Sequence, residues 1–233
     1  MTFNYILKKL KSISNTKAVA GMARFGINPE NTYGISIPTL RKMSKEIGKN
    51  HGLAQRLWSS GIHEARILAG MIDEPEKLTD KQLENWVKDF DSWDVCDQVC
   101  TNLFEDTPFA YKKAVAWSKR KEEFIKRAGF VMMARLAVSD KKAEDERFLR
   151  FLPLIKSEST DNRNFVKKAV NWALRQIGKR NINLNRKAIE TARKIQEMDS
   201  RSAKWIASDA LKELTSTAVQ RRLEDYTETK IIP

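Results

Sequence analysis

The segment from Asp91 to Cys100, DSWDVCDQVC, combines an indole with three carboxylates. On a helix, Trp93 and Asp97 are four residues apart, so their side chains share one face. A carboxylate there can stabilise a positively charged transition state, and the face of an indole attracts cations. A structural interpretation also stands, in which Trp93 belongs to the core and Asp94 and Asp97 favour the start of a helix.

The two cysteines of the chain, Cys96 and Cys100, lie in the same segment and are also four residues apart. We interpret them as small buried thiols on one helical face. A zinc site needs further nitrogen or sulfur ligands, and His51 and His63 are distant in sequence and lack ligand spacing. We therefore expect no structural metal, no disulfide and no cofactor.

The charge of the chain is large and unevenly distributed. The formal net charge is +13, yet residues 64–106 hold 12 acidic and 4 basic residues, against 18 and 39 in the rest. A positive protein with one acidic segment favours a polyanionic partner, with nucleic acid as the first candidate. The alternative is that the charge only keeps a helical protein soluble.

The composition, 41% hydrophobic and 31% charged, is typical of a globular protein. No apolar run reaches the roughly 18 residues of a membrane span. The amino terminus carries an apolar stripe at helical spacing, with lysines between, formed by Phe3, Ile6, Leu7, Leu10 and Ile13. We interpret it as the first structural helix of a cytoplasmic protein, with an amphipathic membrane-surface helix as the alternative.

Helical periodicity continues along the chain, and an internal repeat defines the fold class. FIKRAGFVMMARLA from Phe124 and FVKKAVNWALRQIG from Phe165 align without gaps at an offset of 41 residues. This offset is typical of paired-helix HEAT or armadillo repeats, at about 40 to 47 residues. HEARILAGMI and RSAKWIASDALKEL look like weaker copies. The sequence therefore predicts an all-α, HEAT-like or armadillo-like solenoid with a concave basic groove.

No low-complexity linker interrupts the chain, so we expect one domain over residues 1–233. Within it we expect N-terminal helices and a cap over 1–48, paired-helix repeats over 49–219 and a C-terminal tail over 220–233. A solenoid capped at both ends favours a monomer.

The sequence resembles the AlkD family of DNA alkylation repair proteins, which are HEAT-like alkylpurine DNA glycosylases. The resemblance covers nearly the whole chain, and several segments carry it: MARFGI, YGISIPTLRKMSKEI, SWDVCD, FIKRAGFVMMARL and FVKKAVNWALRQIGKRN. Its most specific parts are the Trp-Asp-x-x-Asp pattern that contains Trp93 and Asp97, the repeat start with Arg127, and NWALRQ with Trp172.

Residue by residue, the resemblance implies that Asp97 is the catalytic carboxylate, that Trp93 and Trp172 face the sugar, and that Arg127 is the active-site arginine. The family often doubles the tryptophan of the first motif, whereas Ser92 precedes it here. This departure concerns lesion fit or packing more than chemistry.

The implied function is excision of cationic N3- and N7-alkylated purines, such as 3-methyladenine and 7-methylguanine, in base excision repair. The partner is double-stranded DNA that contains them, gripped through its backbone without a base-flipping pocket. We expect further phosphate contacts from Arg135, Arg175, Lys168 and Arg24, and a cytoplasmic protein that joins the nucleoid when bound. A non-catalytic nucleic-acid-binding solenoid and a protein-binding HEAT scaffold are the alternatives.

Overall fold

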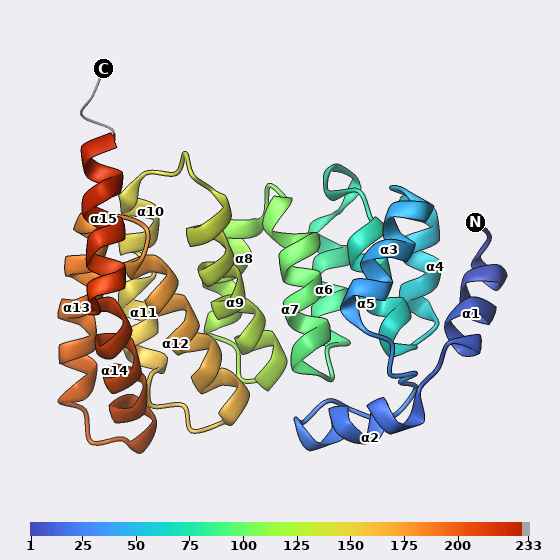
Figure 1. The fold of residues 1–233 in the computed structure, drawn as a ribbon, viewed down its shortest axis with the longest axis horizontal. Helices are drawn as coiled ribbons and strands as arrows, with labels where there is room; N and C mark the ends of the chain where they lie inside the picture. The colour runs from blue at the N-terminus through green and yellow to red at the C-terminus, as the bar shows by residue number, and fades with distance from the viewer. Residues whose placement is uncertain (230–233) are drawn as a thin grey trace. The chain divides into compact units, whose positions relative to one another are not determined.

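The computed structural model of the protein describes residues 1–229, with side chains described as far as Asp225. This part of the chain forms fifteen α-helices and two short 3-10 helices, and residues 1–229 contain no strand. The predicted all-α class is therefore confirmed. The chain divides into two compact units, Met1–Phe109 (unit 1) and Ala110–Pro233 (unit 2), both drawn in Figure 1.

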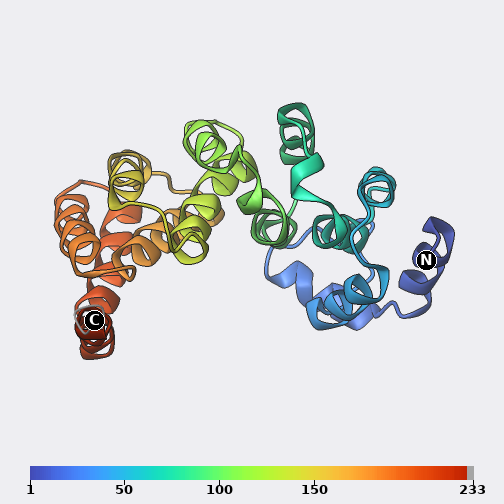
Figure 2. The ribbon, with the colours of Figure 1, turned by 90° about the horizontal axis from the view of Figure 1, so that it is seen from above.

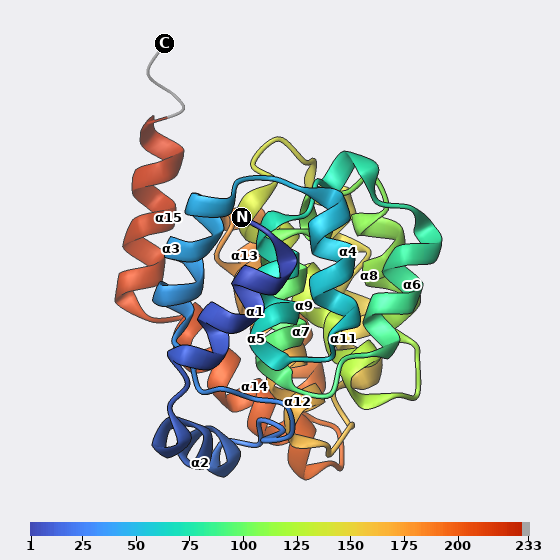
Figure 3. The same cartoon turned by 90° about the vertical axis from the view of Figure 1, so that its right-hand side faces the viewer.

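Unit 1 is organised around one buried helix, α5, nine of whose ten residues have little or no exposure. The helices α1, α3, α4 and α7 all pack against α5, and Figure 3 shows α1 and α4 beside it. The elements of unit 1 are α1 (Phe3–Ser12), α2 (Thr16–Arg24), α3 (Ile37–Ile47), α4 (His51–Ser59), α5 (His63–Ile72), η1 (Pro75–Lys77), α6 (Asp80–Lys88), α7 (Trp93–Asn102) and η2 (Phe104–Asp106).

The amino-terminal helix α1 is part of the core of unit 1. Its apolar stripe buries Ile6 and Leu10 completely, and α1 packs against α4 and α5. The interpretation as a structural first helix is confirmed by this packing. None of the described helices combines the length and the apolar character that crossing a membrane requires.

Aromatic rings fill the space between α4 and α6. Trp58 and Trp86 stack with ring centroids 4.0 Å apart and planes within 2° of parallel. Phe90 meets Trp58 edge-on at 6.0 Å, and Phe104 lies 6.5 Å from Trp86. Offset and edge-to-face ring pairs each add about 0.5 to 1.5 kcal/mol to area burial, so this cluster holds the outer helices of unit 1 together.

Unit 2 contains the two aligned repeats as neighbouring long helices, α9 and α12. The rings of Phe124 and Phe165, which start the two repeats, lie 5.7 Å apart. Figure 2 shows the helices of unit 2 nearly end-on. Its elements are α8 (Ala110–Ser118), α9 (Glu123–Ser139), α10 (Asp145–Leu149), α11 (Leu152–Glu158), α12 (Asn164–Gly178), α13 (Ile182–Gln196), α14 (Arg201–Leu214) and α15 (Thr217–Thr229).

Packing in unit 2 follows the order of the repeats. The helix α9 lies between α8 and α12, and α12 in turn packs against α13 and α14. Gly129 permits the close approach of α9 to α8, because a β-carbon there would lie 2.3 Å from the backbone nitrogen of Ser118. The weaker copy RSAKWIASDALKEL forms α14, and HEARILAGMI forms α5 in unit 1.

The predicted C-terminal tail, residues 220–233, begins within a helix. Residue 220 falls inside α15, whose Val219 and Leu223 are buried, because an apolar spacing of four residues lets this helix pack against α13 and α14. Residues 230–233 of the predicted tail lie outside the described chain. The prediction of a single domain over 1–233 stays a prediction, as does a groove running along the whole chain.

Candidate functional site

The face of α7 that carries Trp93 and Asp97 forms as the spacing predicts. Trp93 is the first residue of α7 and Asp97 lies one turn further, and both side chains are half-buried. The indole nitrogen of Trp93 donates a hydrogen bond of 3.0 Å to the carbonyl oxygen of Phe25. This bond fixes the ring orientation, so a ligand would meet the face of the indole and not its N–H.

The connection between α2 and α3 holds the start of α7 in place. The backbone N–H of Asn28 donates to the Ser92 hydroxyl oxygen at 2.9 Å, and its side-chain amide donates to Asp91 at 3.1 Å. Ser92, where the family often has a second tryptophan, is completely buried. A small polar residue therefore makes a structural contact at this position.

Glu64 in α5 supports the same connection, and the sequence reasoning missed it. Its carboxylate has 0% exposure and accepts backbone hydrogen bonds from Tyr33, at 2.9 and 3.0 Å, and from Ile35, at 3.1 Å. A buried carboxylate is costly unless several donors satisfy it. The available signal was an acidic residue inside the apolar run HEARILAGMI.

His63 and Asp94 form a second polar contact, between α5 and α7. Nε2 of His63 lies 2.9 Å from a carboxylate oxygen of Asp94. Burial of His63 favours its neutral form, but the hydrogen bond to Asp94 and the charges of Asp94, Glu64 and Asp91 outweigh burial and raise its pKa. The side chain of Asp94 therefore joins α7 to α5.

Cys96 and Cys100 are both buried on α7, as the spacing predicts. Burial, followed by the neighbouring Cys96, raises the pKa of the Cys100 thiol. A thiol with a raised pKa is a poor nucleophile. Among the described residues, no group of three or more His, Cys, Asp or Glu side chains has a metal-binding arrangement.

In unit 2, Arg127 lies on α9 and is only 6% exposed. Its Nη1 donates a hydrogen bond of 2.6 Å to the carbonyl oxygen of Phe165, near the start of α12. This contact joins the two aligned repeats and orients the guanidinium, which has five N–H donors in total. A phosphate contact by Arg127 stays a prediction and would have to use its other donors.

One face of α12 carries Trp172 together with several cations. Lys168, Trp172 and Arg175 follow each other at intervals of four and three residues, so they share a side of the helix, and Lys179 caps its carboxyl-terminal end. Trp172 is half-buried and Lys168 is exposed. An indole and an exposed lysine thus lie together, an arrangement that suits a sugar and its phosphate.

One of the predicted phosphate ligands, Arg175, is also engaged within unit 2. Arg175 forms ion pairs with Asp209 at 3.3 Å and Glu213 at 2.8 Å on α14, so a phosphate would compete with these carboxylates. Arg135 on α9 is half-buried. Arg24, at the end of α2 in unit 1, is exposed beside Phe25, which is 75% exposed. DNA contacts by these arginines stay predictions.

The site residues therefore fall into two pairs. Trp93 and Asp97 share a face in unit 1, while Arg127 and Trp172 lie on neighbouring helices of unit 2. Their convergence on one groove stays a prediction.

The fold defines the class of protein. A solved structure described as a new family of proteins related to the HEAT-like repeat DNA glycosylases, with affinity for branched DNA structures, matches with a TM-score of 0.76. The match covers 90% of this chain and 94% of that chain at 18% sequence identity. This likeness confirms the predicted HEAT-like helical repeat fold.

The model of the DNA alkylation repair enzyme family matches residues 6–214. The chain belongs to this family, as the resemblance predicts, and the membership makes DNA its expected partner. No curated protein matches significantly.

Proposed function

We propose that the protein is a DNA glycosylase that excises purines carrying a positive charge from alkylation at N3 or N7. The observation that carries the proposal is the half-buried pair Trp93 and Asp97 on one face of α7, in a family member that also has Arg127 and Trp172. The chemistry of such a lesion needs these residue types.

A cationic purine is already a good leaving group, because breaking its bond to the sugar neutralises the base. The base departs with the bonding electrons as a neutral purine and leaves positive charge on the deoxyribose, shared between the carbon that carried the base and the ring oxygen bonded to it. Asp97 would stabilise that charge and orient the water that adds to the carbon. The proton of the water passes to solvent, and the DNA retains an abasic sugar.

The aromatic residues and the arginine would position the sugar. Because the N–H of Trp93 is bound to Phe25, its ring face is the surface offered to a cationic sugar, which the negative quadrupole of the ring attracts. Trp172 would cover the sugar from α12. Arg127 would hold an adjacent phosphate through donors other than the one that contacts Phe165.

The test is release of free methylated purine from methylated duplex DNA by the wild type, Asp97→Asn and Asp94→Asn. We expect Asp97→Asn to lose about a hundredfold to a thousandfold in rate, the range for loss of one electrostatic stabiliser, while DNA binding persists. Asp94→Asn is the matched control, since Asp94 lies on the same helix but pairs with His63. Undiminished release by Asp97→Asn would refute the role of Asp97.

A second candidate is a non-catalytic DNA-binding protein with a preference for branched DNA. The observation that favours it is the described affinity of the structural relative for branched DNA structures. Competition between a four-way junction and a duplex of equal length tests it. Tighter junction binding by the wild type, with no base release from methylated duplex, would select this candidate over the glycosylase.

A further inference from the structure

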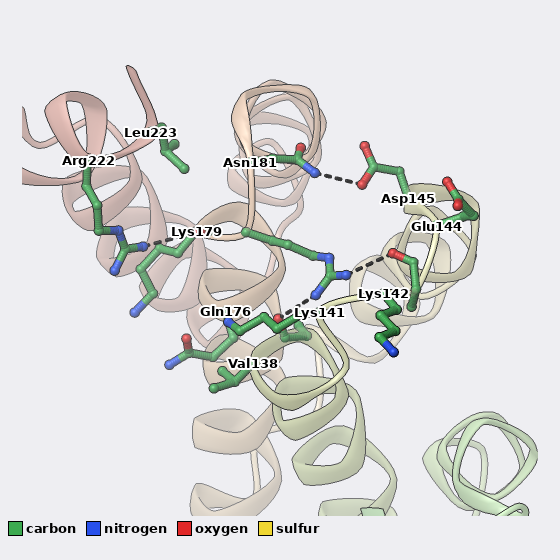
Figure 4. A pocket seen from close by; sticks show the side chains of 13 residues that line it. Val138, Lys141, Lys142, Glu144, Asp145, Gln176, Lys179, Asn181, Arg222 and Leu223 are labelled. Atoms are coloured by element: carbon green, nitrogen blue, oxygen red, sulfur yellow. Dashed lines mark hydrogen bonds between the residues drawn. The ribbon is translucent and has the colours of Figure 1, made fainter. Parts of the chain in front are cut away.

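Unit 2 contains a strongly basic pocket that the proposed chemistry does not use. The pocket has a volume of about 690 Å³ and lies at the carboxyl-terminal ends of α9 and α12, beside α15. Five cationic side chains line it, Lys141, Lys142, Lys179, Arg180 and Arg222, against the two carboxylates Glu144 and Asp145. Figure 4 shows these side chains around the opening.

Contacts within the protein fix the position of Arg180 in the pocket wall. Its guanidinium donates to the carbonyl oxygens of Ala137 at 3.2 Å and Ala143 at 2.8 Å, the bonds drawn as dashed lines in Figure 4. The same group lies 4.4 Å from the ring centroid of Phe148. Arg180 therefore keeps one orientation, and its charge stays at the pocket.

The loop that supplies Lys141 and Lys142 is also fixed. Asp140 accepts a hydrogen bond of 2.9 Å from the Tyr111 hydroxyl and one of 3.0 Å from the backbone N–H of Ala143. Burial, followed by this bond to Asp140, raises the pKa of Tyr111, so the hydroxyl keeps its proton. Lys141 and Lys142 thus extend as exposed side chains from an ordered base.

The opposite wall is tied to α15. Arg222 donates a hydrogen bond of 2.9 Å to the carbonyl oxygen of Lys179, and Lys179 pairs with Glu213 at 2.6 Å. Glu144 and Asp145 offset only two of the five cations in the lining, so the lining keeps a positive excess. The excess of positive charge favours an anion with several acceptor oxygens.

The pocket adjoins the face of α12 that carries Trp172. Lys179, which caps the end of α12, is seven residues beyond Trp172, about 10 Å along the helix axis. This distance is shorter than the roughly 12 Å width of a DNA major groove. A duplex with one sugar against Trp172 therefore has further phosphates within reach of Lys179 and the side chains around it.

We propose that this pocket binds backbone phosphates of the DNA at a distance from the lesion and supplies much of the affinity for undamaged duplex. The proposal rests on the proposed function for the placement of the lesion sugar at Trp172. Such contacts are independent of sequence and release counterions. Removing one of them should therefore reduce the slope of log affinity against log salt by about one.

The experiment compares two variants that each lose three positive charges. The pocket variant is Lys141→Ala, Lys142→Ala and Arg222→Ala, all exposed positions. The control is Arg186→Ala, Lys187→Ala and Arg193→Ala on α13, which are exposed and do not line the pocket. Affinity for an undamaged duplex is measured over a series of salt concentrations, with circular dichroism to verify helix content.

We expect the pocket variant to lower the slope of log affinity against log salt by about 2 to 3 and to bind at least about tenfold more weakly at low salt. The control should change the slope by less than about one. Equal slopes for the two variants would overturn the proposal. The result is independent of base release, so a wild type that binds DNA without releasing purine would end only the glycosylase assignment.

A titration with inorganic phosphate tests whether the ligand of the pocket is DNA or a small phosphate compound. We expect phosphate alone to bind weakly, because one ion meets fewer of the cations than a DNA backbone does. Tight phosphate binding that the pocket variant abolishes, with an unchanged affinity for duplex, would overturn the assignment to DNA.

Discussion

Units 1 and 2 differ most in their charge. Residues 1–109 carry 14 basic and 14 acidic side chains, whereas residues 110–233 carry 29 and 16, so the whole excess of +13 belongs to unit 2. Unit 1 nevertheless holds Asp97, the carboxylate proposed to face a cationic sugar. Under the proposed function, attraction of a polyanion and stabilisation of a positive transition state would fall to separate parts of the chain.

The two units also hold their polar groups by different means. In unit 1 the buried carboxylate of Glu64 gathers backbone N–H groups and fixes the connection that supports Trp93. In unit 2 the guanidinium groups of Arg127 and Arg180 bind backbone carbonyls and join neighbouring repeats. In these contacts unit 1 thus holds backbone N–H groups with a carboxylate, and unit 2 holds backbone carbonyls with guanidinium groups.

The largest effect on stability should come from the buried carboxylate of unit 1. Glu64→Ala leaves the N–H groups of Tyr33 and Ile35 without their acceptor, so we expect the free energy of unfolding to fall by about 3 kcal/mol. Urea denaturation measures it. The control is Glu213→Ala in unit 2, a partly exposed ion pair whose loss should cost about 1 kcal/mol or less. Equal losses would break the contrast between the two units.

A second comparison is between two tryptophans of unit 2. Trp172→Ala should slow release of methylated purine about tenfold, equivalent to about 1.4 kcal/mol of cation–π stabilisation. Trp205→Ala is the control, because Trp205 is exposed on α14 and contacts Lys167, whose Nζ lies 4.9 Å from its ring centroid. A similar decrease in both variants would assign the effect to packing of α12 and α14.

A third comparison takes one exposed cation from each unit. Lys168→Ala in unit 2 and Arg24→Ala in unit 1 should each lower the salt slope of duplex binding by about one, with affinity reduced evenly across sequences. Fluorescence anisotropy at several salt concentrations measures both. An unchanged slope for Arg24→Ala alone would confine phosphate binding to unit 2 and sharpen the division of charge.

The smallest expected effect is a pH dependence of unit 1. The pKa of His63 is raised above its ordinary 6.5 in the folded protein, so protonation favours the folded state. The stabilising contribution is complete below the unfolded pKa and is lost as pH rises through the folded value. Unfolding free energy should therefore decrease from about pH 6 upward, and Asp94→Asn should flatten this decrease. An equal pH dependence in the variant would exclude the His63–Asp94 pair as its source.

The helices were predictable because their signals are local. The aligned repeats from Phe124 and Phe165 became α9 and α12, and the spacing of Trp93 and Asp97 placed both on one face of α7. Periodicity of 3.6 residues and turn residues at fixed offsets depend only on neighbouring positions. The family resemblance added proposed roles for these residues, and the structure places each of them on a helix.

The partners of the polar side chains were not predictable. Glu64 and Tyr33, His63 and Asp94, and Arg175 and Glu213 are separated by 31 to 38 residues in sequence, and composition contains no signal for such pairs. Tertiary packing decided them, because a buried carboxylate or guanidinium is stable only where the fold brings opposite charges or backbone groups to it.

The sequence by itself determined the all-α class, the repeat helices, the excess of positive charge and the residue types of the proposed site. Only the tertiary structure decided that the charge excess falls in one compact unit, that the N–H of Trp93 is bound within the protein, and that five cations from three separate segments surround one pocket. Local periodicity specifies helices, whereas the surface that a ligand meets is assembled from residues that only folding brings together.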